Sequence, residues 1–195
     1  MNSRKQYGAV LPRPFYDRPA EVVARALLGK ILVHRDAAAR IVETEAYLGL
    51  TDRAAHAWRG LTPRTKVLFG APGHAYVYLI YGMYECLNLV AEGEGSPGCV
   101  LIRALEPVAG IDGMRERRGA VKRDRDLANG PGKLTIAMGV TRALNGADVT
   151  RGVLTVCEPV SQEEFEIGVS PRIGIQHNVD WPLRFFIAGN PCVSR

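Results

Sequence analysis

The 195-residue sequence contains no long apolar run. A helix that crosses a bilayer needs about 20 consecutive, mostly apolar residues, and no segment of the chain approaches that length. The opening residues 1–5 are polar and lead into no apolar stretch of the signal-peptide kind. We therefore expect a protein that does not contact membranes and that is located in the cytoplasm.

Cysteine and histidine are scarce, with four of each. The cysteines form no Cys-x-x-Cys pair and the histidines no His-Glu-x-x-His motif; they stand at Cys86, Cys99, Cys157, Cys192, His34, His56, His74 and His177. Structural zinc sites use ligands at short, fixed spacings, so a metal-dependent mechanism has no support. Disulfides are rare in reducing compartments, and we expect free, mostly buried thiols.

Charge is only mildly one-sided, at a formal net +5 with a pI near 9.2. That balance permits an acidic partner such as nucleic acid without pointing to one. Length and composition are those of a soluble globular protein with one domain. We expect a single domain over residues 1–195, of which residues 1–16 form an irregular arm, because Pro12 and Pro14 interrupt regular structure there.

Strand and helix patterns alternate along the rest of the chain. A helix is predicted to start at Asp17-Arg18-Pro19 and to stop at Gly29. Other helices are predicted over residues 107–117 and 132–138, and strands over residues 30–34, 40–47, 76–81, 84–90, 99–105, 153–157, 172–175 and 184–187. This mixture indicates an α+β fold with a curved, mainly antiparallel sheet and flanking helices.

The strand over residues 40–47 places two carboxylates on one face. Glu43, Glu45 and Tyr47 share that face because side chains alternate along a strand. Two carboxylates on one face serve no packing purpose, so the face is either wet or lines a site. Arg103 lies in another, very apolar strand and needs a buried partner or a polar cavity. Glu45 is a plausible partner.

Residues 76–90 predict a β-hairpin with Gly82 next to its tip. Tyr76 and Tyr78 fall on one face of the first strand, and Tyr81 falls on the other face near the tip. Four tyrosines within nine residues, Tyr84 included, offer flat faces for stacking a planar ligand. The alternative is a tyrosine-rich edge hairpin that packs on a core.

Polar residues between and after these stretches allow two interpretations each. Asp52 could cap a short helix over residues 53–58, and His56 on that helix is either structural or part of a site. The basic loop with Arg64 and Lys66 either contacts phosphates or is a solvated surface. Residues 115–126 form either a mobile solvated loop or a surface that follows a nucleic-acid backbone.

Taken together, these stretches resemble the alkyladenine (N-methylpurine) DNA glycosylase family. The resemblance rests on Val-Glu-Thr-Glu-Ala-Tyr-Leu-Gly at 42–49, Ala-Ala-His at 54–56, Tyr-Val-Tyr-Leu-Ile-Tyr-Gly-Met-Tyr at 76–84 and Leu87-Asn88, and continues through 100–107, 129–134 and 173–184. It implies a compact domain with a protruding β-hairpin. It also implies a base-excision-repair enzyme that flips alkylated or deaminated purines out of duplex DNA and hydrolyses the N-glycosidic bond, leaving an abasic site.

The resemblance also implies roles for individual residues. Glu45 would be the general base that activates water for attack at C1′, and Arg103 would orient Glu45 and the water. Glu43 is the competing candidate for the base. The flipped base would enter a slot between aromatic side chains, and Asn88 would lie at the floor of that slot and exclude guanine. Tyr47, His56 and Tyr78 would sandwich the flipped base, Tyr81 would intercalate into the duplex, and Met83, Tyr84, Arg64 and Lys66 would make further DNA contacts.

Lys133 raises the possibility of an amine nucleophile, as in glycosylases that form a Schiff base. The family that this chain resembles uses water as the nucleophile, so we expect a monofunctional enzyme without metal or organic cofactor. We also expect it to be monomeric and, if prokaryotic, associated with the nucleoid. The alternatives are a non-catalytic binder of damaged DNA and an RNA- or nucleotide-binding protein. Glu45 favours the enzyme, because a binder does not need a carboxylate at C1′. Trp58 and Leu50 depart from the family pattern, and Trp58 could alter the slot rim and the lesion preference.

Overall fold

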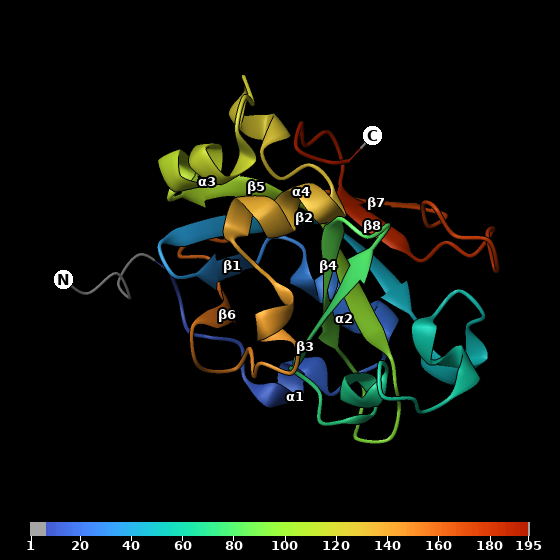
Figure 1. The fold of residues 1–195 in the computed structure, drawn as a ribbon. Coiled ribbons are helices and arrows are strands. Elements are labelled where there is room, and N and C mark those ends of the chain that lie inside the picture. The colour runs from blue at the N-terminus through green and yellow to red at the C-terminus, as the bar shows by residue number, and fades with distance from the viewer. Residues whose placement is uncertain (1–6, 195) are drawn as a thin grey trace.

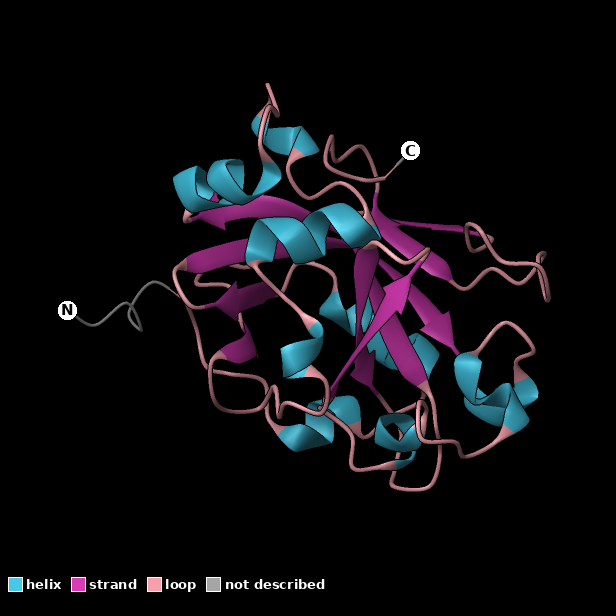
Figure 2. Ribbon diagram, viewed as in Figure 1, coloured by secondary structure: helices cyan, strands magenta, loops and turns pink. Residues whose placement is uncertain are grey.

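A mostly antiparallel sheet of eight strands forms the centre of the computed structural model, which describes residues 7–194 (Figures 1 and 2). The strands are β1 (Ile31–His34), β2 (Ala37–Tyr47), β3 (Ala75–Ile80), β4 (Tyr84–Val90), β5 (Cys99–Ala109), β6 (Leu154–Cys157), β7 (Ile167–Ser170) and β8 (Arg184–Ile187). Their order is β3-β4-β5-β2-β1-β6, and β8 pairs with both β2 and β7. The predicted α+β class is confirmed.

Strand β2 organises the sheet. It pairs with β5 along one edge, and along the other edge with β1 first and then with β8 at residues 43–45. The ladder with β5 shifts register between Ile41 and Thr44, and such bulges re-aim side chains. The Thr44 hydroxyl donates to the Ala24 carbonyl at 2.9 Å. Glu43 and Glu45 are fully buried on either side of it.

Within residues 7–194, four helices and five short 3₁₀ turns accompany the sheet. They are α1 (Arg13–Tyr16), α2 (Ala20–Leu27), α3 (Ile111–Arg118), α4 (Pro131–Met138), η2 (Gly49–Thr51), η3 (His56–Arg59), η4 (Lys66–Phe69), η5 (Asp124–Asp126) and η6 (Arg142–Leu144). Helix α2 packs on β2 behind the sheet, and α4 crosses in front of it against β4, next to α3 (Figure 1). The apolar side chains between these layers form the main core.

The hairpin follows the sequence prediction. Ile80 pairs with Tyr84, and residues 81–83 form the tip. Tyr81 and Gly82 have φ angles of 53° and 70°, the conformation of the tight turns that match strand twist in hairpins. The Tyr81 side chain is 81% exposed. The tip therefore projects into solvent and is not packed on the core.

Several predicted elements differ from the structure. The helix expected from Pro107 begins at Ile111, and Pro107 continues β5. Proline is tolerated there because β4 pairs with β5 only at residues 99–101, so this ladder requires no N–H donor from Pro107. The strand expected over residues 172–175 is absent, and its place in the sheet is taken by β7. Residues 37–39, expected as a connection, open β2.

The arm expected over residues 1–16 is described from Tyr7 onward. Val10 forms an isolated bridge with Cys157, and residues 13–16 form helix α1. Two prolines are compatible with this because they fall at and just inside the helix start, where a missing N–H costs little. Tyr16 is fully buried, so the second half of the segment packs on the core.

Candidate active site

A cavity of about 760 Å³ lies beside the hairpin. It collects most of the predicted site residues, namely Tyr47, His56, Tyr78, Tyr81, Tyr84, Asn88 and Arg103. Met83, Arg64 and Lys66 do not line it, although the Arg64 guanidinium lies 5.4 Å from the centre of the Tyr78 ring. Segments that are far apart in the sequence, from Tyr47 in β2 to His177, thus form the wall of one cavity.

Glu45 is fully buried directly behind that wall. Its Oε1 atom lies 3.2 Å from Nη1 of Arg103 and accepts the backbone N–H of Ile173 at 2.8 Å. Its Oε2 atom accepts the Tyr47 hydroxyl at 3.0 Å. All three partners line the cavity, whereas Glu45 itself does not. The three residues therefore lie between the Glu45 carboxylate and the cavity and contact both.

Two opposing effects act on the acidity of Glu45. Burial raises the pKa of its carboxyl above the ordinary value, and Arg103, the Ile173 N–H and the Tyr47 hydroxyl act against that rise. The net result is a raised pKa. A carboxylate with a pKa closer to neutral pH is a stronger proton acceptor than an exposed one.

Glu43 has a different environment from Glu45. Its Oε1 accepts from Nε of Arg103 at 3.0 Å, Nε of Arg184 at 2.7 Å and the hydroxyl of Ser194 at 2.8 Å. Its Oε2 accepts the Ser194 N–H at 2.7 Å. Glu43 therefore has four polar contacts, one more than Glu45, and two of them come from guanidinium groups. It anchors Arg103.

Three aromatic rings form one side of the cavity. The Tyr76 hydroxyl lies 3.0 Å from Nδ1 of His56, and the rings of His56 and Tyr78 are 4.5 Å apart in an edge-to-face arrangement. Although part of His56 is exposed, desolvation against the tyrosines and the nearby Arg64 lower the pKa of His56 to about 4. His56 is consequently neutral at pH 7.

Asn88 is buried at the base of the same wall. Its amide Nδ2 donates to the Tyr76 carbonyl at 3.4 Å, and its Oδ1 lies 3.9 Å from Sγ of Cys99. Both contacts are long for hydrogen bonds. The predicted free thiols are found as well, since all four cysteines are buried and unpaired.

Asp52 and Arg172 form a buried ion pair beside Tyr47. No local sequence pattern indicates this pair. Both side chains have 0% exposure. Asp52 does accept the Ala54 N–H at 3.0 Å, as expected for a cap, but the helix that follows is the 3₁₀ turn η3 at residues 56–59. The pairing spans 120 positions, so no motif spacing could have revealed it.

Basic side chains line the cavity edge. Arg53, Arg118, Lys133 and His177 all contribute to it. Within the basic segment over residues 115–126, Arg115 forms an ion pair with Asp124 at 2.8 Å. Arg118 is the arginine of this segment that lines the cavity. Lys133 donates to Asn129 at 2.9 Å.

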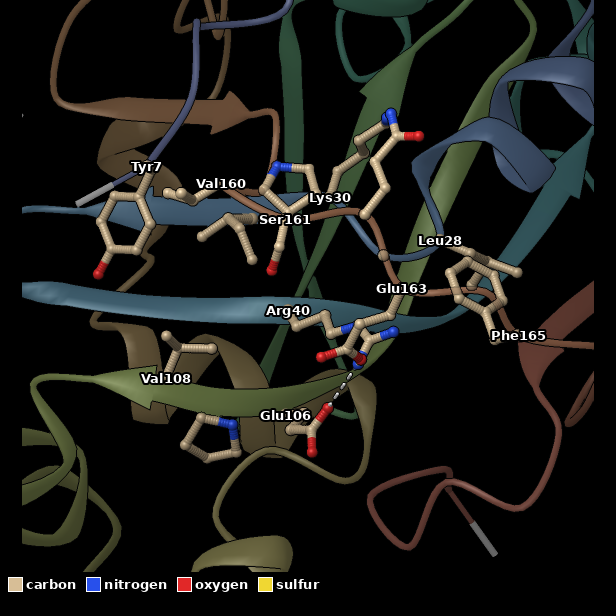
Figure 3. A pocket seen from close by; sticks show the side chains of 15 residues that line it. Tyr7, Leu28, Lys30, Arg40, Glu106, Val108, Val160, Ser161, Glu163 and Phe165 are labelled. Carbon is tan, nitrogen blue, oxygen red and sulfur yellow. Dashed lines mark hydrogen bonds and ion pairs between the residues drawn. The ribbon is translucent and has the colours of Figure 1, made fainter. Parts of the chain in front are cut away.

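A second cavity, of about 710 Å³, lies at the other end of the β2–β5 ladder (Figure 3). In Figure 3, Arg40 lies between Glu106 and Glu163. Its Nη1 atom is 3.7 Å from Oε2 of Glu106 and 2.8 Å from Oε2 of Glu163. Lys30 pairs with Glu158 at 2.6 Å. The charged side chains named here are paired with one another, and none of the predicted site residues lines this cavity.

Within residues 7–194, no group of three or more His, Cys, Asp or Glu residues is placed to hold a metal ion. None of the helices described there has the length and apolar character to cross a membrane.

Comparison with known proteins gives a consistent result. The family model described as methylpurine-DNA glycosylase matches residues 14–191. A protein of Methanocella arvoryzae is 52% identical over 194 residues, which cover 95% of this chain and 96% of the relative. Proteins of Methanoculleus marisnigri and Legionella pneumophila strain Corby are 49% and 47% identical, each over 95% of this chain and 98% of the relative. All three are named as candidate 3-methyladenine DNA glycosylases.

Proposed function

The chain belongs to the methylpurine-DNA glycosylase family, and from this premise we propose that it excises alkylated or deaminated purines from duplex DNA as a monofunctional glycosylase. Water attacks C1′, the N-glycosidic bond breaks, and an abasic site is left. The observation that carries the proposal is the Glu45 carboxylate, held behind an aromatic cavity by Arg103, Ile173 and Tyr47. We propose that it acts as a monomer.

The hydrogen bonds of Glu45 identify the oxygen that keeps an unused acceptor position. Oε1 already interacts with Arg103 and the Ile173 N–H, while Oε2 accepts only the Tyr47 hydroxyl. Each carboxylate oxygen has two lone pairs, so Oε2 keeps one free. Oε2 is therefore the proposed general base, and it lies next to a hydroxyl that lines the cavity. Positioned base catalysis of this kind contributes about 10²–10⁴-fold.

Arg103 connects the two carboxylates. Its Nε binds Glu43 at 3.0 Å and its Nη1 binds Glu45 at 3.2 Å. The pair of ion pairs fixes the guanidinium at the cavity wall, where it orients Glu45 and the attacking water. The negative charge of Glu45 also stabilises the positive charge that develops on the sugar in the transition state.

The aromatic residues serve base flipping. Tyr47, His56 and Tyr78 line a slot that holds a purine between flat faces. The exposed Tyr81 at the hairpin tip enters the minor groove and fills the gap left by the flipped base. The neighbouring tip residues and the basic loop contact the duplex further; they are Met83, Tyr84, Arg64 and Lys66.

Two residues set which base is accepted. Asn88, buried at the slot floor, leaves no room for the exocyclic amine of guanine. His56 is neutral because its pKa is lowered to about 4. If the Tyr76 hydroxyl donates to Nδ1, the other ring nitrogen carries the proton and can donate to a purine acceptor. A neutral His56 is not the proton donor for the leaving base at pH 7.

A single-lesion duplex tests the proposal. The wild-type protein should release 3-methyladenine or hypoxanthine and leave an abasic site that breaks on alkali treatment. Glu45→Gln should bind the lesion duplex normally and release no base. Glu163→Gln, which changes an exposed carboxylate at the second cavity, serves as the matched control. A wild-type protein that binds damage without releasing bases would instead be a damage-binding protein, and normal turnover by Glu45→Gln would exclude Glu45 as the base.

A further inference from the structure

The Asp52–Arg172 ion pair is the strongest feature outside the residues already assigned. Arg172 holds Asp52 through two nitrogens, Nη2 at 2.9 Å from Oδ1 and Nη1 in contact with Oδ2. Neither side chain is exposed. Burying two charges has a large desolvation cost that their attraction often only balances. Net stabilisation alone is therefore a weak explanation for this pair.

Arg172 connects the pair to the general base. Its Nη1 donates to the Ala46 carbonyl at 3.0 Å, and its guanidinium covers the Tyr47 ring at 4.6 Å from the ring centre. Ala46 and Tyr47 directly follow Glu45. The residue after Arg172 is Ile173, whose N–H binds Glu45 Oε1 at 2.8 Å. One guanidinium thus fixes both the strand that carries the base and the segment that supplies its hydrogen-bond donor.

Asp52 connects the same pair to the slot. Its Oδ2 accepts the Leu48 N–H at 3.2 Å, and its Oδ1 accepts the Ala54 N–H at 3.0 Å. The chain continues from Ala54 into η3, which begins with His56. The carboxylate therefore holds the end of β2 and the start of the segment that carries the imidazole.

We propose that Asp52 and Arg172 are positioning residues that lock Tyr47, His56 and the Ile173 N–H into one arrangement around Glu45. This inference rests on the proposed function. Neither Asp52 nor Arg172 lines the cavity, and the pair acts by keeping Oε1 of Glu45 occupied so that Oε2 is the oxygen left for water. It also supports one face of the Tyr47 ring, so that the ring is held ready to stack a base.

The test uses two variants that keep both charges buried. Arg172→Lys retains the positive charge but loses the planar fork that reaches Asp52 and Ala46 together. Asp52→Glu moves the carboxylate by one methylene. Misplacement of a catalytic group by about 1 Å can cost about 100-fold, so kcat for base release should fall about 10- to 100-fold in each variant. KM should change less than about threefold, because the stacking surfaces remain.

A pH profile separates positioning from mere stability. Weakening the Ile173 hydrogen bond removes a contact that lowers the pKa of Glu45, so the acid limb of kcat should move to higher pH in both variants. The matched control is Arg40→Lys, the same exchange in the ion pairs of the second cavity. It should leave kcat and the pH profile unchanged.

Each outcome decides the question. A folded Arg172→Lys or Asp52→Glu protein with wild-type kcat and pH profile would overturn the positioning role and leave the proposed function intact. Failure of both variants to fold would make the pair a requirement of folding and would also overturn it. A wild-type protein that releases no base would remove the proposed function together with this inference.

Discussion

The backbone N–H of Ile173 donates to Glu45 across 2.8 Å, between residues 128 positions apart in the chain. A backbone donor has a fixed direction once its segment is fixed, unlike a hydroxyl that rotates. The orientation of the carboxylate therefore depends on an irregular segment, residues 171–177, that crosses the end of β2. The acidity of Glu45 is the most direct consequence that can be measured.

Base release should be lost at acid pH because Glu45 must be deprotonated to accept a proton. Activity is present above the pKa of Glu45 and disappears as the pH falls through it. Burial raises this pKa above the ordinary value of 4.5, so the loss should begin at a higher pH than for an exposed glutamate. Single-turnover release of a cationic base such as 7-methylguanine, which leaves without protonation, gives the profile.

Tyr47→Phe should move that acid limb to still higher pH. The Tyr47 hydroxyl donates to Oε2 and lowers the pKa of Glu45, while the ring that stacks the base stays in place. Lesion affinity measured under non-turnover conditions is the control and should change little. An unchanged or lower acid limb would contradict the assignment of Oε2 as the base.

Tyr81→Ser should weaken binding to lesion-containing duplex without affecting folding. Aromatic stacking on a base contributes about 1–3 kcal/mol, so the dissociation constant should rise about 5- to 150-fold. Because the side chain is 81% exposed, the melting temperature should not change. Val160→Ser, another exposed apolar residue at 74%, is the control. A lower melting temperature with intact binding would mean that Tyr81 has a structural role.

Lys133→Gln should leave base release intact and reduce the salt dependence of DNA affinity. Water, not an amine, is the proposed nucleophile, and Lys133 is an exposed cation at the cavity edge. Loss of one phosphate contact should lower the slope of log affinity against log salt by about 0.9. Arg151→Gln, at a side chain 83% exposed, should not change the slope. Borohydride trapping of the wild-type protein on DNA, lost in Lys133→Gln, would instead show a Schiff base.

Local patterns were sufficient for the parts of the site that lie on regular elements. Alternation places Glu45 and Tyr47 on one face of β2, and the hairpin turn follows from Gly82 next to an aromatic run. The predicted contact of Arg103 with Glu45 is found, because a charge in an apolar strand requires a buried partner. The second contact of Arg103, with Glu43, was not predicted, although Glu43 shares the face of Glu45 on β2.

Long-range pairing explains what the sequence did not indicate. Residues 172–175 have the composition of a strand, but Ile173 binds Glu45 and Arg172 binds Asp52, so the segment is used by the site and not by the sheet. Pro107 suggested a helix start, although a position of β5 beyond its ladder with β4 accepts proline equally well. In both cases the tertiary context overrides the local preference.

Tyr16→Phe should stabilise the protein. The Tyr16 hydroxyl is buried and has no hydrogen-bond partner among the described residues, and an unsatisfied buried polar group costs about 1–3 kcal/mol. The free energy of unfolding should rise by about 1 kcal/mol, with a melting temperature higher by about 2–4 °C. Thr44→Val removes a buried hydroxyl that does donate, to Ala24, and should lower stability. A destabilised Tyr16→Phe protein would mean that the hydroxyl has a partner.

Asn88→Ala should relax discrimination against guanine. The amide is buried at the slot floor and its two contacts are long, 3.4 Å to the Tyr76 carbonyl and 3.9 Å to the Cys99 thiol, so its removal should cost little stability. Guanine differs from hypoxanthine only by the 2-amino group. The ratio of hypoxanthine to guanine release should therefore fall about 10- to 100-fold, a range typical of steric discrimination in a pocket. Parallel duplexes that carry either base at the same position measure this ratio, and an unchanged ratio in the folded variant would assign the exclusion of guanine to other residues of the slot.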